Sequence, residues 1–96
     1  MPAYCIAEVT VTDAEGFAEY REAVPATIAQ YGGRYLARGG RVESQEGGWQ
    51  PKRLVILEFP SMEQALAWYH SEEYRGPKAI RQRCAETKFV IVEGAG

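Results

Sequence analysis

Residues 53–59, Arg-Leu-Val-Ile-Leu-Glu-Phe, form a strand-length run whose odd and even positions are both apolar over most of its length. Side chains of a strand alternate between its two faces, so the apolar odd positions point one way while Leu54 and Ile56 point the other. Residues 89–92, Phe-Val-Ile-Val, show the same doubly apolar pattern. A chain this short contains too few helices to cover both faces of a sheet. The pattern therefore predicts that a second copy of the chain covers one of them.

The N-terminal third of the chain predicts a strand followed by a helix. Residues 4–11 are rich in Ile, Val and Thr, and Thr12-Asp13-Ala14-Glu15 has the form of a capping box with Thr12 as the N-cap. The apolar stripe of the helix recurs at three-and-four spacing and comprises Phe17, Tyr20, Val24, Ile28 and Tyr31. Pro25 has no amide hydrogen to offer the preceding turn, which predicts a kink or two helical pieces. Gly32-Gly33 ends the helix.

The middle of the chain predicts two strands joined by a hairpin connection. Residues 34–42 form the first of them, weakened by Gly39-Gly40, which indicates a bulge or a close approach of another group to the backbone. Residues 43–52 are rich in turn-forming residues and connect this strand to residues 53–59.

The last third of the chain predicts further helix and a final strand. Pro60 stops the preceding strand, and Ser61-Met62-Glu63-Gln64 is a second capping box. The apolar side of the helix that it opens comprises Met62, Ala65, Leu66, Trp68 and Tyr69. Gly76-Pro77 breaks the polar stretch that follows, and we expect a short helix over residues 77–83. Residues 87–93 form the last strand.

The order β-α-β-β-α-β is the split βαβ, or ferredoxin-like, pattern of an α+β domain. Right-handed crossovers place the four strands in the order 4-1-3-2 in an antiparallel sheet, with two helices on one face. Residues 1–96 then form a single domain. Cys5 and Cys84 fall at opposite ends of neighbouring strands, beyond the reach of a disulfide.

The second sheet face predicts a homodimer. In a monomer with both helices on one face, the other face should be polar, yet Leu54, Ile56 and one parity of residues 89–92 would be exposed there. Leaving about five such side chains in water forfeits on the order of 10 kcal/mol, at ~1.5–3 kcal/mol each. Face-to-face packing of two sheets removes that cost. The alternative is a monomer with a small exposed apolar patch.

Composition and charge exclude several function classes. A net charge of -2 and a pI near 5.4 argue against a protein built to hold nucleic acid, which requires a concentrated basic face. The N-terminus lacks the pattern of a secretory signal, and no segment is apolar enough to span a membrane, so we expect a cytoplasmic protein without a membrane partner. The two cysteines form no metal-ligand or disulfide pattern, so we expect reduced thiols, no metal site and no cofactor.

Three segments resemble one known family. They are residues 32–40, Gly-Gly-Arg-Tyr-Leu-Ala-Arg-Gly-Gly; residues 57–61, Leu-Glu-Phe-Pro-Ser; and residues 68–74, Trp-Tyr-His-Ser-Glu-Glu-Tyr. Together they resemble the domain-of-unknown-function 1330 family of the dimeric α/β-barrel superfamily, over nearly the whole chain. The resemblance implies a homodimer with facing sheets and a cavity near the open side of each sheet. Related folds include antibiotic-biosynthesis-type monooxygenases, muconolactone isomerases and haem-degrading enzymes, but kinship of fold does not assign chemistry.

Two charged residues are candidates for binding and proton transfer. Arg38 stands between Leu36 and Gly40 on its strand face, where a guanidinium beside an apolar surface suits a carboxylate or enolate ligand. The alternative is an ion pair with an acid such as Glu58 or Glu8. Glu58 is the sole acid in an apolar strand, and burial would turn it into a general base; alternatively, it faces water or pairs with Arg38.

A second group of candidates follows the helix that begins near residue 62. His70, the only histidine, could act as an acid or base or as an axial haem ligand, whereas a capping cation is the competing interpretation. Ser71 and Tyr74 belong to a Ser-x-x-Tyr element that the family resemblance includes, and their hydroxyls could orient a ligand. The competing interpretation is a local turn. Trp49 sits in a glycine-rich loop tip, as dimer packing or as a lid.

These residues leave the function open between two main classes. The first is a small enzyme that needs no cofactor and acts on a small carboxylate or enolisable compound, with Arg38 holding the anion and His70 or Glu58 moving a proton. The second is a noncatalytic domain that binds a small ligand or another protein. An RNA-binding module shares the element order but needs exposed aromatic residues on its central strands, where this chain offers Leu54 and Ile56.

Overall fold

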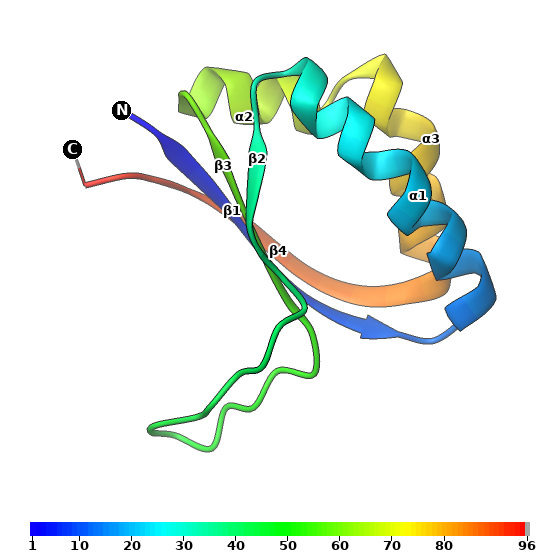
Figure 1. The fold of residues 1–96 in the computed structure, drawn as a ribbon, viewed down its shortest axis with the longest axis vertical. Helices are drawn as coiled ribbons and strands as arrows, with labels where there is room; N and C mark the ends of the chain where they lie inside the picture. Colours follow the sequence, from blue (N-terminus) through cyan, green and yellow to red (C-terminus); the bar gives the residue numbers. More distant parts are fainter. Residues whose placement is uncertain (96) are drawn as a thin grey trace.

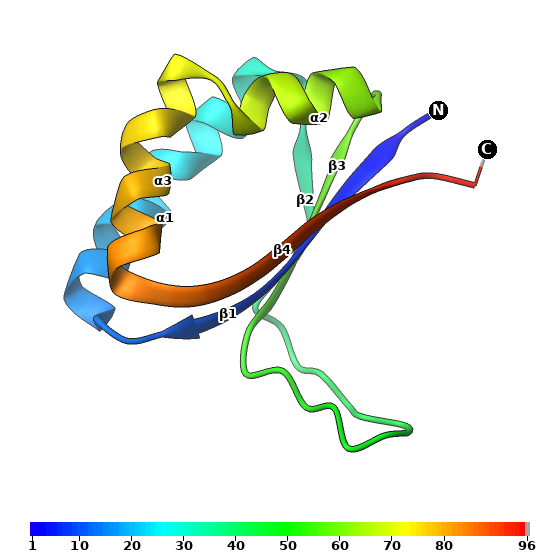
Figure 2. The same ribbon diagram turned by 180° about the vertical axis from the view of Figure 1, so that it is seen from behind.

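The structure is a computed structural model that describes residues 1–95. Its elements are β1 (Ala3–Val11), α1 (Ala14–Gln30), β2 (Arg34–Arg38), β3 (Leu54–Phe59), α2 (Met62–Tyr69), α3 (Glu72–Cys84) and β4 (Ala85–Glu93). The four strands form one antiparallel sheet in the order β2-β3-β1-β4, which confirms the predicted topology. All three helices lie on the same side of the sheet (Figures 1 and 2). The fold is therefore α+β and ferredoxin-like.

The second crossover contains two helices, and the prediction of a short helix over residues 77–83 is wrong. Helix α3 begins at Glu72 and continues through Gly76 and Pro77 to Cys84. Its buried face, which carries Tyr74, Arg81 and Cys84, packs on the rest of the protein. Tertiary packing thus overrides two residues that disfavour helix.

The first helix also differs from its predicted form. Helix α1 is one element rather than two, although Pro25 lies inside it. Its N-cap is Asp13, whose carboxylate accepts from the Gly16 amide, and not Thr12. The amide of Thr12 instead donates to the carbonyl of Cys84, so the chain still runs beside α3 at that residue and turns into the helix one residue later.

Strand β2 ends at Arg38, four residues before the predicted end at residue 42. Its register with β3 shifts between Tyr35 and Ala37, so the irregularity lies within the strand rather than at Gly39-Gly40. Gly39 has φ of 76°, and a Cβ atom there would lie 2.5 Å from a guanidinium nitrogen of Arg53. The close approach predicted for this glycine pair is therefore a contact with Arg53.

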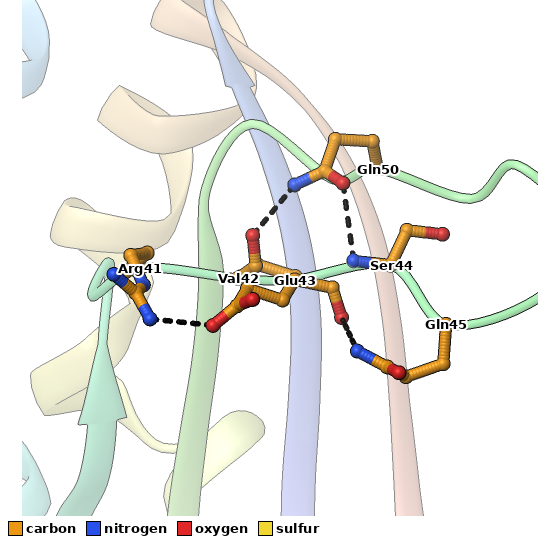
Figure 3. A network of polar contacts seen from close by, with 6 residues as sticks. All are labelled: Arg41, Val42, Glu43, Ser44, Gln45 and Gln50. Carbon is orange, nitrogen blue, oxygen red and sulfur yellow. Dashed lines mark hydrogen bonds and ion pairs between the residues drawn. The ribbon is translucent and has the colours of Figure 1, made fainter.

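The connection between β2 and β3, residues 39–53, extends away from both layers (Figure 1). The Gln50 side chain joins its two sides by accepting from the Ser44 amide and donating to the Val42 carbonyl (Figure 3). Arg41 and Glu43 form an ion pair on the same segment (Figure 3). We call this segment the arm.

The two faces of the sheet differ in what covers them. The helix-covered face contributes alternate residues of the strands to the core, namely Ala3, Cys5, Ala7, Val9, Val55, Leu57, Phe59, Phe89 and Ile91. The opposite face carries Tyr4, Ile6, Glu8, Leu54, Ile56, Glu58, Val90 and Val92, and we call it the open face. Within residues 1–95, no helix is both long enough and apolar enough to cross a membrane.

Candidate functional site

A cavity of about 40 Å³ lies between the sheet and the helices. Its walls are mostly apolar and aromatic, with contributions from Cys5, Ala7, Val9, Phe17, Val24, Ile28, Val55, Leu57, Trp68 and Phe89. The volume exceeds that needed for a single water molecule, about 10–15 Å³. The family resemblance implied a cavity near the open side of the sheet; this one lies on the helix-covered side, and a second, more open pocket is lined by Arg34 and the open-face Glu58.

Four arginines line this cavity, and no carboxylate is among its lining residues in the part of the chain described. They are Arg21 of α1, Arg38 at the end of β2, Arg53 just before β3 and Arg81 of α3. In a chain with a net charge of -2, this is a local concentration of positive charge without compensating acids. Arg21 and Arg38 are exposed, so the cavity reaches solvent beside them.

Arg53 and Arg81 each carry a buried nitrogen without a hydrogen-bond partner, Nε of Arg53 and Nη2 of Arg81. Arg81 as a whole is only 4% exposed. A buried polar atom that lacks a partner costs free energy, more so when the group is charged. Burial, and next the positive charges of Arg21 and Arg38, lower the pKa of Arg53. An anion in the cavity would offset both penalties.

A hydrogen-bonded chain of three side chains stands at one end of the cavity. Arg81 Nε donates to the Tyr74 hydroxyl across 3.2 Å, and the hydroxyls of Tyr74 and Tyr20 lie 2.8 Å apart. Burial raises the pKa of both tyrosines, so both phenols keep their protons. Tyr74 is fully buried, and either hydroxyl can be the donor in its hydrogen bond with Tyr20. Tyr20 also lines the cavity, so its hydroxyl is within the site.

Arg38, predicted as the ligand anchor, does line the cavity. It donates to the main-chain carbonyl of Arg21 across 2.9 Å and lies over the Tyr35 ring, 4.5 Å from its centroid. The alternative partners of the sequence analysis are occupied elsewhere: Glu58 pairs with Arg34, and Glu8 accepts from Trp49. The alternative of an Arg38 ion pair with either acid is therefore wrong.

Tyr74 and Ser71 lie close to the site without lining its cavity. Tyr74 stacks on Trp68 with ring centroids 4.1 Å apart and reaches the cavity through Tyr20 and Arg81. Ser71 is the N-cap of α3: its hydroxyl accepts from the Tyr74 amide and donates to the Trp68 carbonyl. Ser71 thus fixes where α3 begins, and with it the place of Tyr74.

Glu58 and His70 lie outside the cavity. Glu58 is on the open face, where its carboxylate is 2.7 Å from Nε of Arg34. His70 is the C-cap of α2 and is exposed, with its ring edge-on to Tyr69. Of the five residues predicted for the site, only Arg38 lines the cavity; Tyr74 contacts two of its lining residues, Ser71 caps the helix that carries Tyr74, and Glu58 and His70 lie apart. Their proton-transfer roles stay predictions, which the cavity does not support.

Sequence analysis missed Arg21, Arg53, Arg81 and Tyr20 as polar residues of the site. One signal was available, because Arg53 shares the odd parity of Val55 and Leu57 and so points to the helix-covered face. Arg81 carried no such signal, since its helix was predicted only as a short polar piece. The remaining nucleophile of the lining, Cys5, is buried, and burial raises the pKa of its thiol to about 12, so it stays neutral and unreactive.

No group of three His, Cys, Asp or Glu side chains within residues 1–95 is arranged to hold a metal ion. The charged and hydroxyl groups that line the cavity are the guanidinium groups of four arginines and the phenols of Tyr20 and Tyr35. Such donors suit an oxyanion, either bound or developing during a reaction.

Comparison with known proteins places this fold and sequence in a family. The chain matches the domain of unknown function 1330 over residues 2–95 and belongs to that family. No curated protein matches the chain.

Solved structures share the fold at low sequence identity. A protein of unknown function from Rhodopseudomonas palustris, RPA0582, is 19% identical with a TM-score of 0.77, over 99% of this chain and 83% of that one. SnoaB, a cofactor-independent oxygenase from Streptomyces nogalater, is 7% identical with a TM-score of 0.67, over 99% of this chain and 94% of that one. A dimeric ferredoxin-like protein of unknown function from Bacteroides fragilis is 15% identical with a TM-score of 0.56, over 97% and 96% of the two chains.

Proposed function

We propose that this protein is a homodimer whose subunits each bind a small organic anion in the four-arginine cavity. The observation that carries the proposal is the pair of buried guanidinium nitrogens, on Arg53 and Arg81, that have no partner in a cavity lined by no carboxylate. The apolar and aromatic walls suit a carboxylate or enolate with a hydrocarbon body. Arg21 and Arg38 at the exposed side raise the local concentration of such anions.

The open face supports the homodimer. Ile6 has Ile56 and Val90 as its cross-strand neighbours, so three apolar side chains form a row across three strands. Val90 and Val92 are 59% and 47% exposed in the single chain. A second copy packed on this face would bury the row, and the dimeric Bacteroides fragilis protein of the same fold supports such an assembly.

A catalytic version of this function is a second candidate. The fold likeness to SnoaB and the Tyr20 hydroxyl in the cavity lining favour it, because a phenol and guanidinium donors would stabilise an enolate or similar oxyanion. The described lining offers no aspartate, glutamate or histidine as a general base. A catalysed substrate would therefore enter already as an anion, or lose its proton to a group outside this lining.

Binding of benzoate and of valerate, measured by titration calorimetry, tests the proposal. We expect both to bind the native protein, and Arg81→Gln to weaken binding at least about tenfold, since a hydrogen bond to a charged group contributes ~1.5–3 kcal/mol. Arg75→Gln is the matched control, because Arg75 lies on the same helix, is exposed and pairs with Glu72. If neither acid binds, or if both variants bind as the native protein does, the cavity is not an anion site.

A further inference from the structure

Arg53 and Arg81, each with one buried nitrogen that lacks a partner, lie near different strands of the sheet. The Arg81 guanidinium carbon lies 5.5 Å from the centroid of Phe89, on the edge strand β4. Arg53 immediately precedes β3, and its guanidinium carbon lies 5.5 Å from the centroid of Phe17 on α1. Strand β1 lies between β3 and β4, and the two guanidinium groups lie over different aromatic rings, so they approach the cavity from different parts of its lining.

The intervening floor is apolar. Phe89 pairs with Ala7, which pairs with Val55, and Val55 pairs with Arg38, so these residues form one row across the four strands. Adjacent strands lie about 4.8 Å apart, so β3 and β4 are separated by roughly 10 Å. Phe89, Ala7 and Val55 all line the cavity and offer no hydrogen bond between its two ends.

Different polar residues lie near Arg81 and near Arg53. At the Arg81 end stand the phenols of Tyr74 and Tyr20. At the Arg53 end stand Arg21 and Arg38, whose charges act on Arg53. A single carboxylate that binds Arg81 beside the phenols would leave the buried Nε of Arg53 without a partner.

We propose, resting on the anion-binding function above, that the ligand carries two acidic groups joined by a short apolar segment, as a dicarboxylate does. One carboxylate meets Arg81 and Tyr20, the other meets Arg53, and the hydrocarbon lies over Ala7 and Val55. The two-ended arrangement selects for the spacing of the acidic groups as well as for their charge.

A calorimetric series of dicarboxylates tests this inference, with malonate, succinate, glutarate and adipate compared with monocarboxylates of equal carbon number. We expect one chain length to bind best, at least about tenfold tighter than its monocarboxylate, because a second charge-assisted contact is added. Sulfate, a compact dianion, reaches only one end and should not match the best dicarboxylate.

Variants then locate the two ends. In Arg53→Gln and in Arg81→Gln, the best dicarboxylate should bind no tighter than its monocarboxylate, whereas Arg75→Gln should keep the preference. Arg81 supports Tyr74, so Arg81→Gln could fail to fold; Arg53→Gln alone must still abolish the preference.

Three outcomes overturn the inference. Equal binding of mono- and dicarboxylates does so while leaving the proposed anion-binding function intact. Sulfate binding as tight as that of the best dicarboxylate shows that total charge decides. Binding of none of these anions overturns the inference and the proposed function together.

Discussion

Arg38 donates a hydrogen bond to the main-chain carbonyl of Arg21, with 2.9 Å between nitrogen and oxygen. In an unbroken α-helix, that carbonyl would accept from the amide of residue 25, which is Pro25 and has no amide hydrogen. The proline therefore leaves an acceptor free on the cavity side of α1, and the guanidinium from β2 occupies it. This contact ties helix to sheet beside the exposed side of the cavity.

The contact predicts that Arg38 and Pro25 are energetically coupled. Arg38→Met should lower the free energy of unfolding by about 1 kcal/mol through the lost hydrogen bond, and by about 0.5–1 kcal/mol through the lost interaction with the Tyr35 ring. In a Pro25→Ala background the cost should be smaller, because the backbone amide restored by that substitution then serves the Arg21 carbonyl. Urea unfolding of the four proteins measures the coupling, expected at about 0.5–1 kcal/mol. Additive effects would show that the contact contributes nothing to stability.

A second prediction concerns how closely β2 approaches the core. A Cβ atom at Gly33 would lie 2.5 Å from the Phe59 ring, which is fully buried. Gly33→Ala should therefore destabilise the protein by about 1–3 kcal/mol, as overpacking of a core does. Gly40→Ala is the control, because no atom lies within 4 Å of a Cβ built there. Equal thermal stability of both variants would contradict the close packing of Phe59 against this turn.

Hydrophobic periodicity gave the element order β-α-β-β-α-β, and right-handed crossovers then predicted the strand order that the sheet has. The parity of Val55, Leu57 and Phe59 faces the helices, and Arg53 shares it, although sequence analysis did not count Arg53 among the site residues. Local signals failed where distant contacts decide the outcome. Gly76 and Pro77 suggest a break, yet the burial of Tyr74 and Arg81 on either side of them keeps α3 continuous.

The candidate site was predictable only in part, for a related reason. Arg38 was predicted as a ligand-binding residue because of its apolar strand neighbours, and it does line the cavity. Glu58 was predicted as a general base because it lies in an apolar strand, but its parity places it on the open face beside Arg34. The phenol chain joins Tyr20 and Tyr74, which are 54 positions apart, and no local pattern records such a pairing.

The Cys5 thiol predicts a loss of stability in alkaline solution. Burial raises its pKa from 9.0 to about 12, so between these values the unfolded chain binds fewer protons than the folded one. Stability from this group is complete below pH 9 and falls as the pH rises toward 12, by about 1.4 kcal/mol per pH unit. Between about pH 8 and 10.5, urea unfolding of Cys5→Ala should thus show about 2 kcal/mol less loss than the native protein. Parallel pH profiles would contradict a neutral, buried thiol.

The open face predicts which substitutions dissociate the homodimer. Val90→Lys places a charge in the row formed with Ile6 and Ile56, so dimerisation would then bury an unpaired ammonium group. We expect sedimentation velocity to show a dimer for the native protein at micromolar concentration and mainly monomer for Val90→Lys.

Leu66→Lys is the matched control: Leu66 is an exposed leucine of α2, in the helix layer, and its replacement should leave the dimer intact. Because Val90 is 59% exposed in the single chain, the monomeric fold should tolerate the lysine, and circular dichroism of Val90→Lys should match the native spectrum. A native protein that sediments as a monomer, or a dimer that Leu66→Lys disrupts and Val90→Lys does not, would place the interface elsewhere or remove it.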